Sequence, residues 1–287
     1  MKEEAHPSQT FLHLLQQGVL PDEQVPTKLF EATQSFVLFV GYPRSGHSLI
    51  GSLLDAHPQM VISNELNVLP LFEAGQSRLH IFQQILKNAV DLGQSGRENS
   101  GYDYQVPGQW QGRFEQIRVI GDKKGGGSAK FLGKAADGGI LELVRRETQL
   151  PLKFIHVIRN PFDSLSTAIR RVLRRRPEAN LEEIFEKKCS NYFFRAQTIQ
   201  DLIQRGEHDI CSIHFREFVQ APKTHLQELC DFLAVDAPAD YLTACASIVW
   251  PKARKSRQQV DFWTPAYIQR VEEGIQNIDF FSPYTFD

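Results

Sequence analysis

Short apolar runs separated by longer amphipathic segments recur along the chain between residues 36 and 215. The runs are four to six residues long and mostly rich in β-branched or aromatic side chains, as in strands whose two faces are both buried. Because helix-like segments follow several of the runs, the pattern predicts βαβ units on a parallel sheet. The expected strands are Phe36–Val40, Met60–Ser63, Arg118–Gly121, Phe154–Ile158 and Ile210–Phe215.

Three amphipathic segments predict helices that would cover this sheet. The first has its apolar residues on one face between positions 49 and 54 and ends at His57-Pro58. The second begins at Asn160-Pro161, because asparagine is a favoured N-cap and proline suits the first helical position. The third runs from about Leu181 to Arg205. The expected fold is therefore α/β, a three-layer domain with a central parallel sheet.

Two regions do not follow the alternation. Residues 75–114 interrupt it, and the part from 93 to 112 is rich in Gly, Gln, Tyr and Trp. Long loops of this kind in α/β domains are often lids or binding elements. The tail after Trp250 is also irregular and carries basic side chains. We expect a single domain over residues 1–287, with a lid or binding insert at about 75–114.

Composition narrows the class of partner. Of 287 residues, 41% are hydrophobic and 23% charged, which is typical of a globular chain. The net charge of −2 gives no basic excess for a long polyanion, so nucleic acid is not an expected partner. The four cysteines lack metal-type spacing, and no apolar stretch approaches the roughly 18 residues of a membrane span. Because the chain starts with an acidic, polar segment, we expect no secretory signal and a cytoplasmic location.

The segment between the first expected strand and the first expected helix has the frame G-x-x-x-x-G-x-S, from Gly41 to Ser48. This is the frame of a Walker A loop, whose backbone N–H groups and helix N-terminus cradle phosphate. A nucleoside triphosphatase has lysine just before the hydroxyl residue, where it reaches the β- and γ-phosphates. Here that residue is His47, and the cation is Arg44. The loop thus predicts a phosphate cradle without the γ-phosphate lysine, and no aspartate stands out as a Walker B metal ligand.

Two motifs give a family resemblance. The segment GYPRSGHSL resembles the 5′-phosphosulfate loop of sulfotransferases that use 3′-phosphoadenosine 5′-phosphosulfate (PAPS), and FIHVIRNPFDSLSTA resembles their 3′-phosphate motif. The longer segment YPRSGHSLIGSLLDAHPQMVISNE is most similar to the branch with tyrosylprotein sulfotransferases and bacterial sulfotransferase domains. His47 replaces the usual threonine, and Leu49 stands where cytosolic members have an aromatic residue.

Weaker matches extend the resemblance from about residue 36 to residue 263. VIGDKK resembles the strand-end lysine motif, which favours Lys123 over Lys124, and ARKSR resembles a basic segment that meets the 3′-phosphate. Ser166 is the alternative to Thr167 as the hydroxyl of the 3′-phosphate motif. The donor-binding residues implied by the resemblance are Pro43, Arg44, Ser45, Gly46, His47, Ser48, Arg159, Thr167, Phe215, Arg254, Lys255, Ser256 and Arg257. Phe215 is equally compatible with a place in the core.

The positions of the candidate residues along the chain agree with this assignment, whatever the order of the strands. Ligands of open parallel sheets bind beyond the carboxyl ends of the strands, and the candidate residues all follow expected strands. PAPS has two anionic ends, which need two cationic sites: the loop with Arg44 and Ser48, and the region of Arg159 with the basic tail. An ATP enzyme would need Mg²⁺ instead of the second site, so we expect no metal.

The resemblance implies sulfuryl transfer by in-line displacement. Glu65 stands where the tyrosylprotein branch has its catalytic glutamate, and His47 is the rival general base. Arg44, Lys123 and the Ser48 hydroxyl would stabilise charge on the leaving group, adenosine 3′,5′-bisphosphate. The expected acceptor is a small-molecule or carrier-bound alcohol, with residues 75–114 as the acceptor insert. The alternatives are a P-loop kinase that uses ATP and Mg²⁺, and a non-catalytic nucleotide-binding module.

Overall fold

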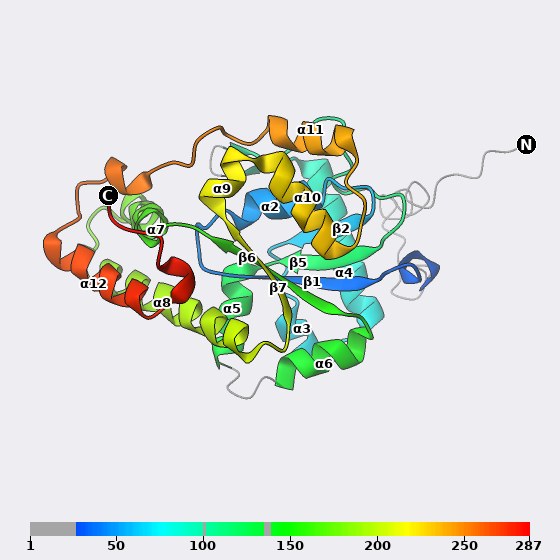
Figure 1. The fold of residues 1–287 in the computed structure, drawn as a ribbon. Helices are drawn as coiled ribbons and strands as arrows, with labels where there is room; N and C mark the ends of the chain where they lie inside the picture. The colour runs from blue at the N-terminus through cyan, green and yellow to red at the C-terminus, as the bar shows by residue number, and fades with distance from the viewer. Residues whose placement is uncertain (1–26, 100–101, 135–138) are drawn as a thin grey trace, which may run out of the picture.

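A parallel sheet of five strands organises the chain (Figure 1). The computed structural model describes residues 27–99, 102–134 and 139–287. Across the sheet the order is β2-β5-β1-β6-β7, and every neighbouring pair is parallel. The bounds are β1 Ser35–Val40, β2 Met60–Asn64, β5 Val119–Lys123, β6 Leu152–Ile158 and β7 Asp209–His214. All five expected strands are therefore present.

Several strand bounds differ by one or two residues from the expectation, and two of these differences concern the candidate site. Strand β5 continues to Lys123, so Asp122 and Lys123 belong to the strand and are held by its ladder with β2. Strand β7 ends at His214, and Phe215 is the first residue of α9 (Phe215–Gln220). Phe215 is therefore the first residue of a helix that lies beyond the carboxyl edge of the sheet.

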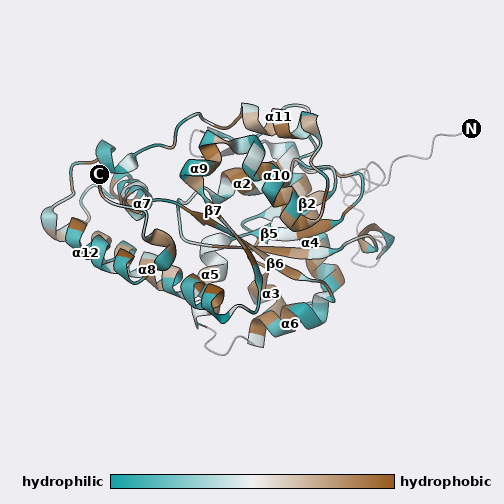
Figure 2. Cartoon of the chain, in the orientation of Figure 1, coloured by the Kyte–Doolittle hydropathy of each residue, from teal (hydrophilic) through white to brown (hydrophobic). Residues whose placement is uncertain are grey.

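Alternate side chains of the strands enter two separate apolar clusters, one on each face of the sheet. Phe36, Leu38 and Val40 of β1 belong to one cluster, and Val37 and Phe39 to the other. This period of two is the geometry of a strand buried on both faces. The expected three-layer α/β fold is confirmed, and Figure 2 shows the apolar strands between the two helical layers.

The two helical layers differ in size. Figure 1 shows α2, α9, α10 and α11 on one face, and α3, α5, α6 and α8 on the other. The first layer has α2 His47–Leu54, α10 Pro222–Leu233 and α11 Ala239–Ser247. The second layer has α3 Leu69–Glu73, α5 Gly125–Lys134, α6 Gly139–Thr148, α7 Pro161–Arg175 and α8 Leu181–Arg205. Short 3-10 helices lie at η1 Thr27–Phe30, η2 Ser256–Gln259 and η3 Asp279–Phe281.

The start of α7 and the bounds of α8 match the sequence expectation. The Asn160 side chain accepts a hydrogen bond from the Phe162 N–H at 2.9 Å, which caps α7, and Pro161 is its first residue. Helix α8 begins at Leu181, after the N-cap Asn180, and ends at Arg205. Local signals located these helices because capping depends only on neighbouring residues.

The interpretation of residues 75–114 as an irregular insert is wrong for its first half. Residues Arg78–Ser95 form α4, an 18-residue helix capped by Ser77. Its apolar side chains, among them Ile81, Phe82, Ile85 and Leu86, are buried in the core beside β1 and β2. The Gly- and Gln-rich sequence that follows obscured this helical period. Beyond α4 lies a short antiparallel pair, β3 Glu98–Asn99 with β4 Tyr102–Asp103.

The tail after Trp250 is also more regular than expected. It contains α12, Pro265–Gln276, whose first turn is capped by the Thr264 side chain. Val271 of α12 and Phe281 beyond it are buried in the larger apolar cluster. Within the described residues, no helix has both the length and the apolar character that crossing a bilayer requires.

Candidate active site

The loop Gly41–Ser48 connects β1 to α2 at the carboxyl edge of the sheet, as its sequence frame predicted. Arg44 and Gly46 have positive φ angles of 71° and 113°. A Cβ atom on Gly46 would lie 2.4 Å from the ring of Phe215, so both the backbone angle and the packing require glycine there. The loop is thus tightly turned, with Phe215 against its outer side.

The ring of His47 is turned into the protein. Its Nε2 lies 3.1 Å from the Val40 carbonyl, which can only accept, so Nε2–H donates and Nδ1 accepts from the Ser45 hydroxyl at 2.9 Å. The ring occupies the space that Cβ atoms on Gly41 and Gly125 would fill. Burial, with the nearby charge of Lys123, lowers its pKa to about 4. A neutral ring with both nitrogens engaged disfavours His47 as the general base.

Strand register brings Glu65 to Lys123. In the β2–β5 pair, Ser63 lies opposite Asp122 and Asn64 opposite Lys123. The Glu65 N–H then donates to the Lys123 carbonyl at 3.1 Å, which extends the ladder by one step beyond the strand. The two residues are 58 positions apart in sequence, but the sheet makes them neighbours.

The Lys123 ammonium joins two predicted site residues. Its Nζ lies 2.6 Å from Glu65 Oε1 and 3.2 Å from the Ser48 hydroxyl. Lys124 contacts the other carboxylate oxygen of Glu65, also at 2.6 Å, but makes no such contact to the loop. The stem of Lys123 passes α2 at Gly51, where a Cβ atom would lie 2.7 Å from Lys123 Cγ. The structure therefore favours Lys123 over Lys124 as the cation that faces the loop.

Burial and ion pairing shift the pKa values of Lys123 and Glu65 in opposite directions. The Lys123 side chain is 3% exposed and that of Glu65 is 50% exposed. Burial lowers the pKa of Lys123, and Glu65 counteracts this only in part. Partial burial by itself would raise the pKa of Glu65, but Lys123 and Lys124 together outweigh it and lower that pKa. Glu65 is therefore a carboxylate at neutral pH, on the solvent side of an almost buried ammonium.

Arg159 follows β6 and has only neutral partners. Its guanidinium donates to the Arg44 carbonyl at 3.0 Å, the Arg254 carbonyl at 3.0 Å and the Ser256 hydroxyl at 3.2 Å. The buried Nε atom has no hydrogen-bond partner. Within the described ranges Arg159 forms no ion pair, and burial lowers its pKa. The charge of Asp163 lies near enough to offset this burial in part, but it does not pair with the guanidinium. A largely buried cation without a salt-bridge partner is a position suited to an anionic ligand.

Thr167 and Ser166 differ in availability. Thr167 is half-buried, and its hydroxyl donates to the Asp163 carbonyl at 2.8 Å within α7, which leaves its oxygen lone pairs free to accept. Ser166 is buried and accepts from the Trp263 indole N–H at 2.9 Å. Of the two hydroxyl residues in the motif, Thr167 is therefore the more accessible.

The basic side chains of residues 254–257 differ in exposure: one is buried in the protein and two are exposed to solvent. Arg257 is buried, forms an ion pair with Asp163 at 2.9 Å, and donates to the carbonyls of Phe286 and Asp287. Its donors are committed to the C-terminal segment, which disfavours the expected direct contact to the donor. Arg254 lies over the Trp250 ring at 3.8 Å, and Lys255 is exposed.

Phe215 lies at the edge of the smaller apolar cluster and packs against it. It is half-buried, packs against Gly46, and has the Arg159 guanidinium 5.9 Å from its ring centroid. It therefore lies between the loop and Arg159, where the resemblance had implied contact with the donor. Asp122 was not among the residues predicted for the site, but its buried carboxylate accepts hydrogen bonds from the turn that carries Glu65. The polar strand-end sequence GDKK was the available signal.

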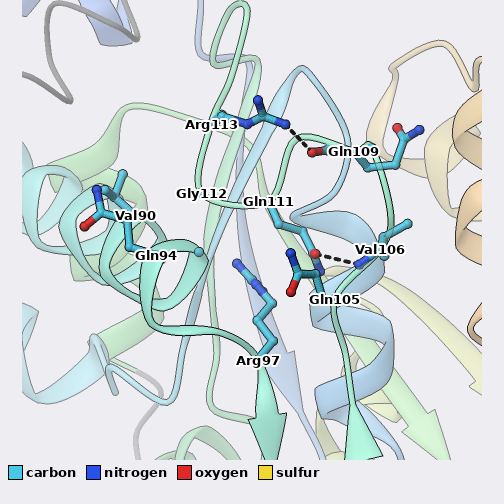
Figure 3. A pocket seen from close by; sticks show the side chains of 11 residues that line it. Val90, Gln94, Arg97, Gln105, Val106, Gln109, Gln111, Gly112 and Arg113 are labelled. Carbon is cyan, nitrogen blue, oxygen red and sulfur yellow. Dashed lines mark hydrogen bonds between the residues drawn. The ribbon is translucent and has the colours of Figure 1, made fainter.

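A polar hollow of about 310 Å³ lies apart from these residues (Figure 3). It is formed by the end of α4 and the segment 105–113, and none of the predicted site residues lines it. On one side Arg97 donates to the Ser52 hydroxyl at 3.0 Å and is paired with Asp55. Burial raises the pKa of Asp55 to about 6. Because Arg97 holds α2 to the insert through this pair, the hollow belongs to the packing of the insert.

Comparison with known proteins identifies the fold. No family model and no curated protein matches the chain. The sulfotransferase domain from the curacin biosynthetic pathway matches the structure with a TM-score of 0.53 and 14% identity, over 89% of this chain and 99% of that chain. The likeness to this domain establishes the fold alone. The resemblance inferred from the motifs is therefore confirmed at the level of a sulfotransferase fold.

Two other solved structures are similar at lower TM-scores. The sulfotransferase domain from the Synechococcus PCC 7002 olefin synthase is 20% identical over 83% of each chain, with a TM-score of 0.45. Mouse sulfotransferase SULT7A1, complexed with PAP, is 13% identical over 89% of each chain, with a TM-score of 0.47.

Proposed function

We propose that this chain transfers a sulfuryl group from PAPS to an acceptor hydroxyl. The observation that carries the proposal is the position of the Lys123 ammonium, which contacts both the Ser48 hydroxyl of the loop and the Glu65 carboxylate. A reaction between an anionic donor held by the loop and a hydroxyl deprotonated by Glu65 needs a cation at this point. The shared fold with a sulfotransferase domain supports the same class of reaction.

The residues around Arg159 suit the second anionic end of PAPS. The guanidinium forms hydrogen bonds only with neutral groups and its Nε is unpaired, and the Thr167 hydroxyl could donate to a phosphate by turning its proton away from the Asp163 carbonyl. Arg254 and Lys255 add exposed positive charge beside it. We assign the 3′-phosphate to this group and the 5′-phosphosulfate to Arg44, Ser48 and the loop amides. Arg257 is left out, because Asp163 already neutralises it.

Glu65 is assigned as the general base and Lys123 as the cation that stabilises the leaving group. PAPS supplies an activated sulfuryl group, and negative charge develops on its bridging oxygen during transfer. A shift of Lys123 toward that oxygen would weaken its bond to Glu65. Because the ion pair is what holds the pKa of Glu65 down, the shift would raise this pKa and strengthen the base when the donor is in place.

A kinase that uses ATP and Mg²⁺ is disfavoured by two contacts. His47 stands where the γ-phosphate lysine is needed, but its neutral ring is bonded to Val40 and Ser45. Asp122 lies at the end of the strand next to β1, where a Walker B aspartate would be expected. Its oxygens accept hydrogen bonds from the chain itself, so they are not directed toward the loop.

We also propose that the acceptor is a small-molecule or carrier-bound alcohol that approaches the exposed side of Glu65. The described part of the insert contacts the tail that carries Arg254. Tyr102 donates to the Ile248 carbonyl and packs on Trp250, whose ring in turn contacts Arg254. If the insert acts as a lid, it would therefore close over the bound donor. The insert and the donor site belong to the same domain.

Calorimetry with two ligands tests the donor class. Adenosine 3′,5′-bisphosphate and ATP with Mg²⁺ are titrated separately into the wild-type chain in one buffer. The proposal expects the bisphosphate to bind at least about tenfold more tightly, a difference of about 1.4 kcal/mol. Tighter binding of ATP with Mg²⁺ would overturn it in favour of the kinase. Bisphosphate binding without sulfuryl transfer to any alcohol would support the non-catalytic module.

A further inference from the structure

The carboxylate of Asp122 is fully buried and surrounded by hydrogen-bond donors. Its Oδ1 accepts from the Ser63 hydroxyl at 2.8 Å and from the Leu66 N–H at 3.2 Å. Its Oδ2 accepts from the N–H groups of Asn67 at 2.7 Å and Val68 at 3.3 Å. The residue is 0% exposed. Three successive backbone amides thus converge on one buried side chain.

These amides belong to the turn that presents Glu65. Glu65 and Asn67 have positive φ angles of 66° and 69°. This region is unfavourable for Glu65, whereas asparagine adopts it more readily. Residues in this region cost of the order of 1 kcal/mol or more each, so other contacts must hold the turn in place. The Glu65 N–H bonds to the Lys123 carbonyl on one side, and the Asp122 carboxylate holds the next three residues on the other.

Asp122 and Lys123 are adjacent in β5, so their side chains point to opposite faces of the sheet. Lys123 contacts the Glu65 side chain, while Asp122 contacts the backbone that follows it. The backbone partners of Asp122 are N–H groups, which can only donate. An ionised carboxylate suits them because both of its oxygens can accept hydrogen bonds. An asparagine of the same shape would place an N–H₂ group against one set of these donors.

We infer that Asp122 is a positioning residue, which fixes the Glu65 carboxylate beside Lys123 by anchoring the amides of residues 66–68. The inference rests on the proposed role of Glu65 as general base. It goes beyond that role because it states that the strained turn is held by Asp122, a residue that contacts neither the donor nor the acceptor. Without the anchor, the turn relaxes toward ordinary φ angles and the base loses its orientation.

The test combines Asp122→Asn with Glu65→Gln in a double-mutant cycle. Asp122→Asn should lower kcat about 10- to 100-fold, as misplaced catalytic groups do, and leave the Kd of adenosine 3′,5′-bisphosphate within about twofold. In the Glu65→Gln background the same change should alter kcat by less than about threefold, because the base is already absent. Equal effects in both backgrounds would overturn the positioning role.

A matched control separates positioning from stability. Asp55 is also buried and accepts from the backbone amides of Ile62 and Gly112 and from Arg97, but none of these partners belongs to the turn of residues 65–68. Asp55→Asn should lower the melting temperature without lowering the kcat of the folded protein. If Asp122→Asn only matched this behaviour, Asp122 would be a structural residue.

Amide hydrogen exchange gives a readout that does not depend on activity. Asp122→Asn should speed exchange at residues 66–68 and leave the amides of β1 unchanged. If Asp122→Asn does not fold, Ser63→Ala replaces it, since this change removes one of the four bonds and should speed the same amides to a smaller extent. Unchanged exchange at residues 66–68 would overturn the inference. Retained turnover in Glu65→Gln would overturn the proposed base, and the inference with it.

Discussion

The Nζ atom of Lys123 lies 2.6 Å from Oε1 of Glu65, and 3.2 Å from the hydroxyl of Ser48. One almost buried ammonium therefore connects the loop after β1 with the turn after β2. The pairing of β5 with β2 creates this contact, because it aligns Asn64 with Lys123 and places Glu65 one step further.

Glu65→Gln should abolish most turnover while donor binding persists. Glutamine keeps the size of the side chain but cannot take a proton, and a general base typically contributes about 10²–10⁴-fold. We expect kcat for sulfuryl transfer to fall by about 10² or more, with the Kd of the bisphosphate little changed. Steady-state kinetics and calorimetry measure the two quantities. Wild-type turnover in this variant would remove Glu65 from the mechanism and return attention to His47.

Arg159→Ala should weaken bisphosphate binding by about 2 kcal/mol, or about 30-fold in Kd, as expected for the loss of a charge-assisted contact. Arg159→Lys should recover only part of the loss, because an ammonium lacks the planar set of donors. Arg175→Ala is the matched control, since it removes one exposed arginine from the end of α7. Equal affinities for Arg159→Ala and the control would contradict the 3′-phosphate assignment.

Gly51→Ala should damage catalysis more than folding. Alanine is the better helix residue by about 1 kcal/mol, but its Cβ would lie 2.7 Å from Lys123 Cγ and displace the ammonium. We expect kcat to fall about tenfold or more. Gly126→Ala is the control in α5, where the added Cβ meets its nearest neighbour at an ordinary 3.6 Å. Similar kinetics for the two variants would show that a side chain at position 51 does not displace the Lys123 ammonium.

Arg257→Ala and Lys255→Ala should have different effects. Removing one partner of a buried ion pair costs about 3–5 kcal/mol, so Arg257→Ala should lower the free energy of unfolding by that amount. Lys255 is exposed, so Lys255→Ala should change this free energy by less than about 0.5 kcal/mol and instead weaken bisphosphate binding. Urea unfolding and calorimetry separate the two effects. A stable Arg257→Ala with poor binding would restore Arg257 as a direct donor contact.

Two buried histidines should make the fold sensitive to acid. Burial lowers the pKa of His47 to about 4 and that of His156 to about 3, below the ordinary 6.5. Between those values and 6.5 the unfolded chain binds more protons, so stability present above pH 6.5 is lost as pH falls. Each histidine should cost about 2 kcal/mol between pH 7.5 and pH 5.

His156→Phe isolates this effect. The ring of His156 packs between Tyr42 and Phe280, where an aromatic replacement fits, and His156 is not a proposed site residue. The drop in unfolding free energy between pH 7.5 and pH 5 should be smaller in the variant by about 2 kcal/mol. The raised pKa of Asp55 acts in the opposite direction, but equally in both proteins. Parallel pH curves would contradict the buried, neutral state of His156.

Local patterns located most elements but not all. The five strands, the cap of α7 at Asn160 and the bounds of α8 follow from periodicity and capping, which involve only neighbouring residues. Helix α4 was missed because the Gly- and Gln-rich sequence after it dominated the interpretation of residues 75–114. Motifs indicated the candidate site residues, but they did not show which side chains already have partners within the protein: Arg257 is paired with Asp163, and His47 donates to the Val40 carbonyl.

The sequence by itself determined the α/β class, the loop from Gly41 to Ser48 and the approximate position of each strand, because each of these is a local property of the chain. Only the tertiary structure decided which of those residues meet. Strand order and register place Glu65 beside Lys123. The ion pair with Asp163 turns Arg257 away from the proposed donor site. These contacts join residues far apart in the chain, so they depend on how the whole sheet is assembled and covered.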